Sequence, residues 1–129
     1  MLPLYLDKND ELESFQDLSK NDKLYPKTAY ALDFYSGAKI AIDSLNKAGM
    51  PINVHVYDTK NDSQVTYDLV TQNEFDEMDL VIGPFYSKNY KIAAEILSRR
   101  DVPTVAPVST KGNLLENIAN SFQVIPTPK

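Results

Sequence analysis

The sequence of 129 residues has no cysteine, one histidine and only four glycines, and each of these shortages excludes a class of function. Without cysteine there is no disulfide framework, no thiol nucleophile and no cysteine-ligated zinc or iron–sulfur site. A single histidine, His55, disfavours a histidine-rich metal centre. The glycines are not grouped, so the chain has neither G-x-G-x-x-G nor a Walker A phosphate cradle. We therefore expect no metal, no cofactor and no nucleotide.

Positive charge and long apolar runs are also scarce. The chain has 13 basic and 18 acidic side chains, a net charge of −5, and only two arginines, Arg99 and Arg100. This balance disfavours a nucleic-acid groove and an anionic membrane surface. The longest apolar runs have four or five residues, whereas roughly 20 are needed to span a bilayer, so we expect no membrane insertion. Residues 1–7 lack the features of a signal peptide.

The apolar pattern alternates between the period of a strand and that of a helix. The clearest helix begins at Thr28, with Phe34, Ala38, Ala41 and Leu45 on one side, and is predicted to end before Gly49 and Pro51. Gly37 near its middle predicts a close approach to a sheet. The sequence predicts strands at 2–6, 52–57, 79–84, 102–108 and 122–125, and further helices at 63–75 and 88–100 with a short turn at 114–119.

This alternation predicts an α/β fold with an open, mostly parallel five-stranded sheet between helices on both faces, a three-layer α/β/α architecture. The strand at 52–57 alternates apolar and polar residues and is placed at the edge, which gives the order 2-1-3-4-5. Residues 1–129 form a single lobe, in which residues 7–27 are a charged insertion with ten charged side chains. A short helix capped by Asp10 and Glu13, a disordered segment and a mobile flap all fit this insertion.

Ligands of such sheets bind at the carboxyl ends of the strands, which selects the loops after Leu6, at 58–62, at 85–87 and at 108–111. A hydrolase using Ser87 or Ser109 with His55 would lack the G-x-S-x-G elbow, and His55 is interpreted as an exposed edge residue. The chain is therefore predicted not to be an enzyme. The carboxylates between 74 and 79 belong to a helix-to-strand connection at the opposite end of the sheet and are interpreted as a solvated turn.

Four residues in the selected loops are candidates for ligand contact. Ser87 is predicted to be the N-cap of the following helix, and a helix N-terminus also favours a carboxylate. For Ser109 and Thr110 a structural role in the loop and a ligand-binding role are equally open. Tyr86 is a cleft-wall aromatic if a cleft exists, and a surface tyrosine otherwise.

Four stretches together resemble a known family. They are Phe34-Tyr35-Ser36-Gly37-Ala38, Val56-Tyr57-Asp58-Thr59, Val81-Ile82-Gly83-Pro84-Phe85-Tyr86-Ser87 and Pro103-Thr104-Val105-Ala106-Pro107-Val108-Ser109-Thr110. In order and spacing they resemble the amino-terminal lobe of type I periplasmic binding proteins, the leucine-binding-protein-like receptors. The version found in Bacteroidetes envelope proteins, often behind LysM modules, is the most similar. The resemblance covers about residues 28–126.

The resemblance implies a solute-binding receptor located outside the cytoplasm. Members have two lobes joined by a hinge, and they clamp a small polar ligand, commonly an amino acid, between them. This chain is then one lobe of a two-lobe binding protein, and its second lobe is expected elsewhere in a longer parent chain. Tyr86, Ser87, Ser109 and Thr110 match the positions that hold the ligand's carboxylate in the family.

Two departures from the family keep an alternative open. Bulky Phe85 and Tyr86 replace small hydroxyl residues after the third strand, and the insertion lies at the mouth of the cleft. Both fit a protein-interaction scaffold in peptidoglycan assembly, and a related outer-membrane lipoprotein that activates peptidoglycan synthases has a similar Tyr-Asp-Thr strand end. Because a lone lobe leaves a face uncovered, we also expect the chain to self-associate around its last strand.

Overall fold

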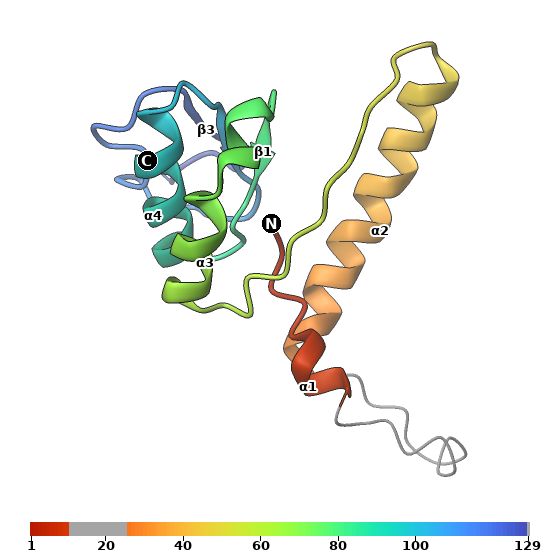
Figure 1. Cartoon of the computed structure of the whole chain (residues 1–129), viewed down its shortest axis with the longest axis horizontal. Helices are drawn as coiled ribbons and strands as arrows, with labels where there is room; N and C mark the ends of the chain where they lie inside the picture. Colours follow the sequence, from red (N-terminus) through yellow and green to blue (C-terminus); the bar gives the residue numbers. More distant parts are fainter. Residues whose placement is uncertain (11–25, 129) are drawn as a thin grey trace.

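The computed structural model describes residues 1–10 and 26–128 (Figure 1). Along the chain the elements are α1 (Leu6–Asp10), α2 (Pro26–Lys47), α3 (Ser63–Val70), a 3-10 helix η1 (Asn73–Glu77), β1 (Val81–Ile82), α4 (Ser87–Ser98), β2 (Thr104–Ala106) and β3 (Ser121–Gln123). The predicted α/β class is confirmed. The short helix expected around Asp10 and Glu13 falls on residues outside those described. No described helix combines the length and hydrophobicity that a membrane span requires.

The sheet has three parallel strands in the order β1-β2-β3, and these are the predicted third, fourth and fifth strands. The fourth predicted strand, β2, pairs only over residues 104–106. Pro103 and Pro107 border it, and proline has no N–H to donate to a neighbouring strand. The five-stranded sheet is not formed. The segments predicted as its first two strands meet at one parallel bridge, between Leu2 and Asp58.

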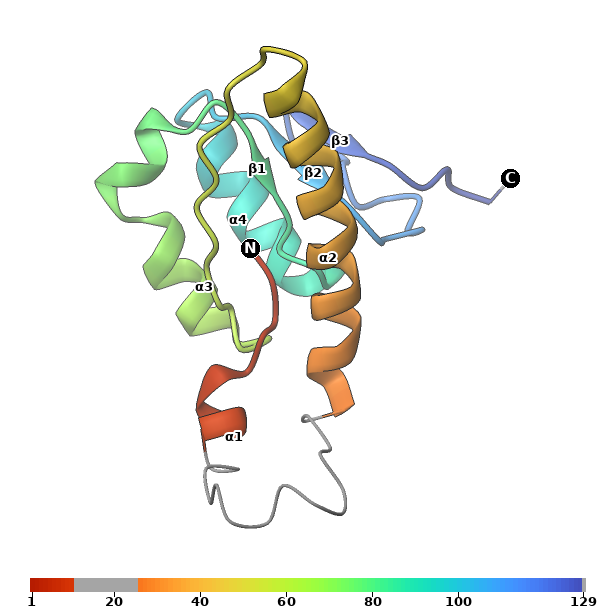
Figure 2. The same cartoon turned by 90° about the vertical axis from the view of Figure 1, so that its right-hand side faces the viewer.

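The pairing between these two segments stops early because a side chain takes over the backbone donors. The Leu2 amide donates to the Tyr57 carbonyl at 3.0 Å, and the Thr59 amide donates to the Leu2 carbonyl at 2.9 Å. The next backbone amides, those of Leu4, Tyr5 and Leu6, donate to the Asp58 carboxylate instead of to a neighbouring strand. The chain then turns into α1, so the prediction of a strand through Leu6 is wrong. Figure 2 shows the two segments beside each other.

The main core lies between the sheet and the helices α3 and α4. One cluster joins Val70, Phe75, Val81, Ala93 and Leu97 with Val102 and Met1, and a second joins Tyr90 and Ala94 to Ala106 and Leu114. The hydroxyl of Tyr90 forms hydrogen bonds with Thr104 Oγ1 at 3.0 Å and Ser121 Oγ at 2.5 Å. The buried tyrosine therefore fixes α4 over the row of residues that β2 and β3 present on this face.

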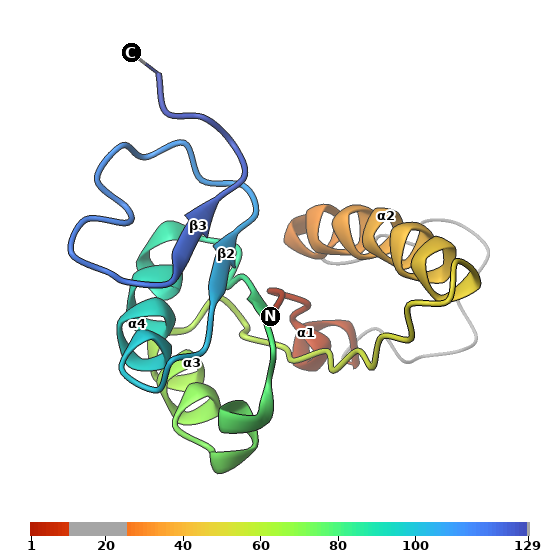
Figure 3. The same cartoon turned by 90° about the horizontal axis from the view of Figure 1, so that it is seen from above.

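The opposite face of the sheet is open in the described part of the chain. Its row is Ile82, Val105 and Phe122, which the register places side by side. Ile82 is 42% exposed and Phe122 is 58% exposed. Helix α2 lies on this side of the sheet, in keeping with the prediction of helices on both faces, but it does not cover the row. Figure 3 shows α2 standing apart from β2 and β3.

Helix α2 contacts the rest of the molecule through its amino-terminal half. Thr28 and Ala31 are buried, and the ring of Phe34 meets the ring of Phe85 edge-on at 5.3 Å. Beyond these turns the helix is largely exposed. No atom lies within 4 Å of a Cβ built on Gly37, so the predicted close approach to a sheet is wrong.

Arg100 connects the end of α3 to the end of α4. Its guanidinium donates to the carbonyls of Val70 and Gln72 and pairs with the Asp76 carboxylate. The hydrogen bond from Arg100 lowers the pKa of Asp76. The stabilisation from this contact is therefore fully present at pH values above the pKa of an unfolded aspartate, which is about 4. It is lost as the pH falls through the lower pKa of Asp76 in the folded chain.

We expect Arg100→Met to lower the free energy of unfolding by about 1–2 kcal/mol at neutral pH, since two carbonyls lose their donor. Part of this difference should disappear at an acid pH below the lowered pKa of Asp76, where its carboxylate is protonated. Urea unfolding at both pH values measures it. Arg99→Met, at the exposed neighbouring position, is the matched control and should change stability little. Equal losses in the two variants would contradict the role of Arg100.

Candidate functional site

The structure brings Ser87 and Ser109 together at the carboxyl ends of β1 and β2. Their Oγ atoms lie 3.0 Å apart. Ser87 begins α4 directly after β1, and Ser109 follows β2, so adjacent parallel strands place the two loops side by side. The Lys111 amide donates to Ser109 Oγ at 3.3 Å, and Gln123 Nε2 donates to the Ser109 carbonyl at 2.6 Å. The hydroxyl pair is thus held by three chain segments.

Ser87 is not the N-cap of α4, which corrects the sequence prediction. Tyr86 occupies that position with φ −94° and ψ 141°, and it makes no side-chain capping hydrogen bond. The hydroxyl of Ser87 lies one residue too late to reach back to the first amides and bonds to Ser109 instead. The amino end of α4 therefore has no side-chain cap, and its amides favour a negatively charged group.

The other two candidate residues lie at the rim of this hydroxyl pair. Tyr86 is 37% exposed and meets the ring of Phe85 edge-on at 6.1 Å. Thr110 is exposed. Phe85 itself is buried against Phe34 of α2, so Phe85 fills the space between the β1 loop and α2. Tyr86 is a partly exposed aromatic beside it.

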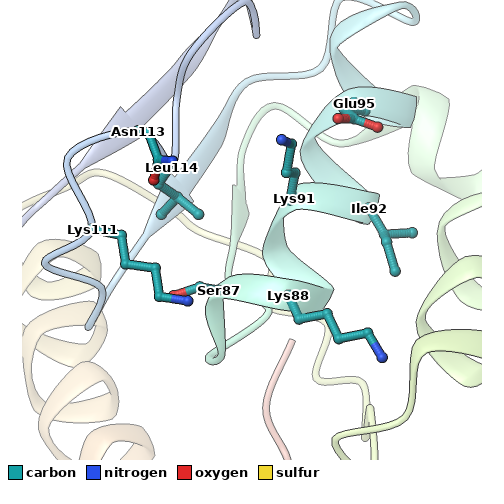
Figure 4. A pocket seen from close by; sticks show the side chains of 8 residues that line it. All are labelled: Ser87, Lys88, Lys91, Ile92, Glu95, Lys111, Asn113 and Leu114. Atoms are coloured by element: carbon teal, nitrogen blue, oxygen red, sulfur yellow. The ribbon is translucent and has the colours of Figure 1, made fainter.

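A cavity of about 320 Å³ opens next to Ser87, between α4 and the loop after β2. Figure 4 shows the side chain of Lys111 extending toward Ser87, with Lys91 across the cavity on α4. Tyr86, Ser109 and Thr110 are not among its lining residues. A second cavity of about 350 Å³ shares Lys91 and Glu95 with it. The hydroxyl of Ser87 and the ammonium groups of the lysines make the first cavity rich in hydrogen-bond donors. It is lined by Ser87, Lys88, Lys91, Ile92, Glu95, Lys111, Asn113 and Leu114.

Two polar residues that position the site were missed by the sequence analysis. The Asp58 carboxylate accepts hydrogen bonds from the amides of Leu4 at 2.9 Å, Tyr5 at 3.1 Å, Leu6 at 2.9 Å and Lys60 at 2.9 Å. Four backbone donors on one carboxylate fix the first two of the selected loops to each other.

The second missed residue is Asn89, which is only 2% exposed. Its amide nitrogen donates to Asn61 Oδ1 at 3.1 Å, and its amide oxygen accepts from Ser63 Oγ at 2.9 Å. The loop at 58–62 is thereby tied to the first turn of α4. The sequence carries one signal for Asn89, which is its spacing. Asn89 lies four residues before Ala93 and eight before Leu97, so all three belong to the buried face of α4.

The groups around Ser87 and Ser109 are mainly hydrogen-bond donors. They comprise hydroxyls, the uncapped amides of α4, an exposed asparagine and lysine ammonium groups, which suit a carboxylate or another small anion. His55 is exposed on the extended segment before Asp58. Across residues 1–10 and 26–128, no group of His, Asp and Glu side chains is arranged to hold a metal ion. The arrangement is suited to binding an anionic group.

Comparison with known proteins supports the fold. The structure is similar to that of a candidate branched-chain amino acid ABC transporter from Rhodospirillum rubrum, with a TM-score of 0.69 and 21% sequence identity. The similarity covers 78% of this chain and 30% of that protein's chain, so the chain spans about a third of its length. No protein-family model and no curated protein sequence matches the chain. The likeness shows the fold: the chain folds like a part of that protein.

Proposed function

We propose that this chain is a solute-binding lobe of a receptor outside the cytoplasm, and that it takes up a small polar ligand bearing a carboxylate. The observation that carries the proposal is the hydroxyl pair of Ser87 and Ser109 at the carboxyl ends of β1 and β2. The pair lies beside the uncapped amino end of α4. The likeness to a transport component supports the same interpretation.

In this proposal the chain binds and orients the ligand and performs no reaction. Ser87 and Ser109 donate hydrogen bonds to the ligand's carboxylate, and the amides at the start of α4 add their partial positive charge. The Lys111 ammonium approaches the same position (Figure 4). Tyr86 and Thr110 border the bound ligand from the rim. A second lobe elsewhere in the parent protein would close over it.

Titration with amino acids, short peptides and muropeptide fragments tests this proposal. A ligand present at 100 times its dissociation constant stabilises the folded chain by about 2.7 kcal/mol, which raises the melting temperature by several degrees. We expect Ser87→Ala and Ser109→Ala each to weaken binding about tenfold, the loss of one hydrogen bond of about 1.4 kcal/mol. Ser36→Ala, at an exposed position on α2, should bind like the unchanged chain. Binding that is indifferent to both serines would contradict the proposed site.

The contact between Phe85 and Phe34 favours a second candidate function. Phe85 is only 7% exposed and its ring meets Phe34 edge-on, so bulky side chains fill the space where the β1 loop faces α2. Such a lobe would serve as a protein-interaction scaffold in peptidoglycan assembly. In that case no small ligand in the panel would change the melting temperature, and Ser87→Ala and Ser109→Ala would leave partner binding unchanged.

A further inference from the structure

Two apolar faces of this chain have no partner among residues 1–10 and 26–128. The first is the open face of the sheet, where Ile82, Val105 and Phe122 form one row. Val124 follows two residues after Phe122 and is 65% exposed. Parallel sheets are normally buried on both faces, because their strands carry apolar side chains on each side. This face therefore requires a cover that the described residues do not supply.

The second face is the far half of α2. The stripe Phe34, Ala38, Ala41 and Leu45 follows the helical period and so lies along one side of the helix. Phe34, at the near end, packs on Phe85. Toward the far end the same stripe becomes exposed, and Leu45 is 40% exposed. This part of α2 is thus an apolar helix side that meets no sheet, standing apart from β2 and β3 (Figure 3).

We propose that the occupant of both faces is a second copy of this chain, so that α2 of each copy covers the open sheet face of the other. One chain carries a sheet face that lacks a helix and a helix side that lacks a sheet, which is the self-complementarity that a two-fold dimer requires. The exposed parts of Ile82, Phe122, Val124 and Leu45 amount to roughly half of the ~800 Å² that each partner buries in a specific dimer.

Charge favours the same pairing. Helix α2 carries three lysines and two aspartates, Lys27, Lys39, Lys47, Asp33 and Asp43. It is therefore net positive in a chain whose total charge is −5. An α2 helix that docks on another copy brings positive charge to an acidic body, and the attraction steers the two copies together. The pairing should weaken at high salt to the extent that these charges contribute.

Cross-linking in this cysteine-free chain tests the pairing directly. Leu45→Cys and Phe122→Cys are prepared as separate variants, mixed, and treated with a short bis-maleimide. We expect a covalent dimer that contains one copy of each variant, at several times the yield from Leu45→Cys mixed with Tyr67→Cys. Tyr67 is the control because it is 49% exposed on α3, which covers the other face of the sheet.

Two outcomes would overturn the proposal. If the double variant Leu45→Cys/Phe122→Cys cross-links within single molecules, α2 closes on its own sheet and the occupant is not a second copy. If light scattering shows the unchanged chain at 14.5 kDa up to its highest soluble concentration, no dimer forms. Phe122→Ser is expected to convert the dimer to a monomer while the circular dichroism spectrum stays the same, since the side chain is largely exposed. A dimer that persists in Phe122→Ser would also exclude this face.

Discussion

Replacing Gly83 by alanine is expected to lower the free energy of unfolding by about 3 kcal/mol, one of the largest effects of any single substitution in this chain. Gly83 has φ +88°, in the region that residues with a Cβ avoid. A Cβ at this position would lie 2.3 Å from the backbone carbonyl oxygen of Met1. That oxygen belongs to the backbone that runs beside β1, where the Met1 amino group donates to the Ile82 carbonyl, so it cannot move aside alone.

Gly37→Ala provides the matched comparison. Gly37 lies inside α2, and no atom lies within 4 Å of the added Cβ. Alanine is favoured over glycine in a helix interior by up to about 1 kcal/mol. The same substitution is therefore expected to stabilise the chain at one position and destabilise it at the other. Urea unfolding of both variants measures the two effects, and a Gly83→Ala variant as stable as the unchanged chain would exclude the close approach of Met1 to β1.

Removing the carboxylate of Asp58 is expected to have a comparable effect. In Asp58→Ala the amides of Leu4, Tyr5, Leu6 and Lys60 lose their shared acceptor. Hydrogen bonds to charged groups contribute more than neutral ones, and we expect a loss of about 3 kcal/mol. The first two loops of the candidate site would also separate, so ligand binding should weaken along with stability.

Asp58→Asn separates the two contributions of this side chain. The asparagine side chain has one accepting oxygen where aspartate has two. Its NH₂ group cannot accept the hydrogen bond that the Leu6 amide donates to Asp58 Oδ2 in the unchanged chain. The loss should fall between that of the alanine variant and zero. Thermal unfolding with hydrogen exchange at residues 4–6 measures it. If Asp58→Ala left exchange at these amides unchanged, the carboxylate would not be what holds this segment.

The candidate site has the character of a binding surface. Ser87 and Ser109 bond to each other, and Ser109 is held by the backbone amide of Lys111 and the side-chain amide of Gln123. Such a pair reorients its hydroxyl hydrogens toward an incoming acceptor without moving the chain. The nearby lysines supply charge, so the site is suited to recognising a carboxylate by position and charge together.

Much of the fold follows from local sequence pattern. The 4-3-4 spacing of Phe34, Ala38, Ala41 and Leu45 predicts α2, and Gly49, with φ +90°, lies just past its end as predicted. Two apolar segments ending at Gly83-Pro84 and Pro107 predict β1 and β2 in their observed order. These features could be predicted because helix periods, caps and prolines act within a few residues of where they occur.

The candidate site was predicted only in part. That Ser87 and Ser109 lie close together follows from two adjacent parallel strands, each with a serine shortly after its end. Their direct hydrogen bond, the uncapped start of α4 and the lysines beside Ser87 depend on where the loop after β2 returns along α4. No local pattern specifies that return. The sequence placed Asp58 in one of the selected loops but gave it no role, because three of its four partners lie more than 50 positions away in the sequence.

By itself, the sequence determined the α/β class, the position of α2, the order of β1, β2 and β3, and the loops that carry Ser87 and Ser109. Tertiary structure alone decided that Asp58 ends the pairing of the first two segments, that Phe85 meets Phe34, and that α2 stands apart from the sheet. The physical reason is the range of the interactions. Periodicity and capping act between near neighbours, whereas carboxylate acceptors, ring contacts and uncovered faces depend on which distant segments finally pack together.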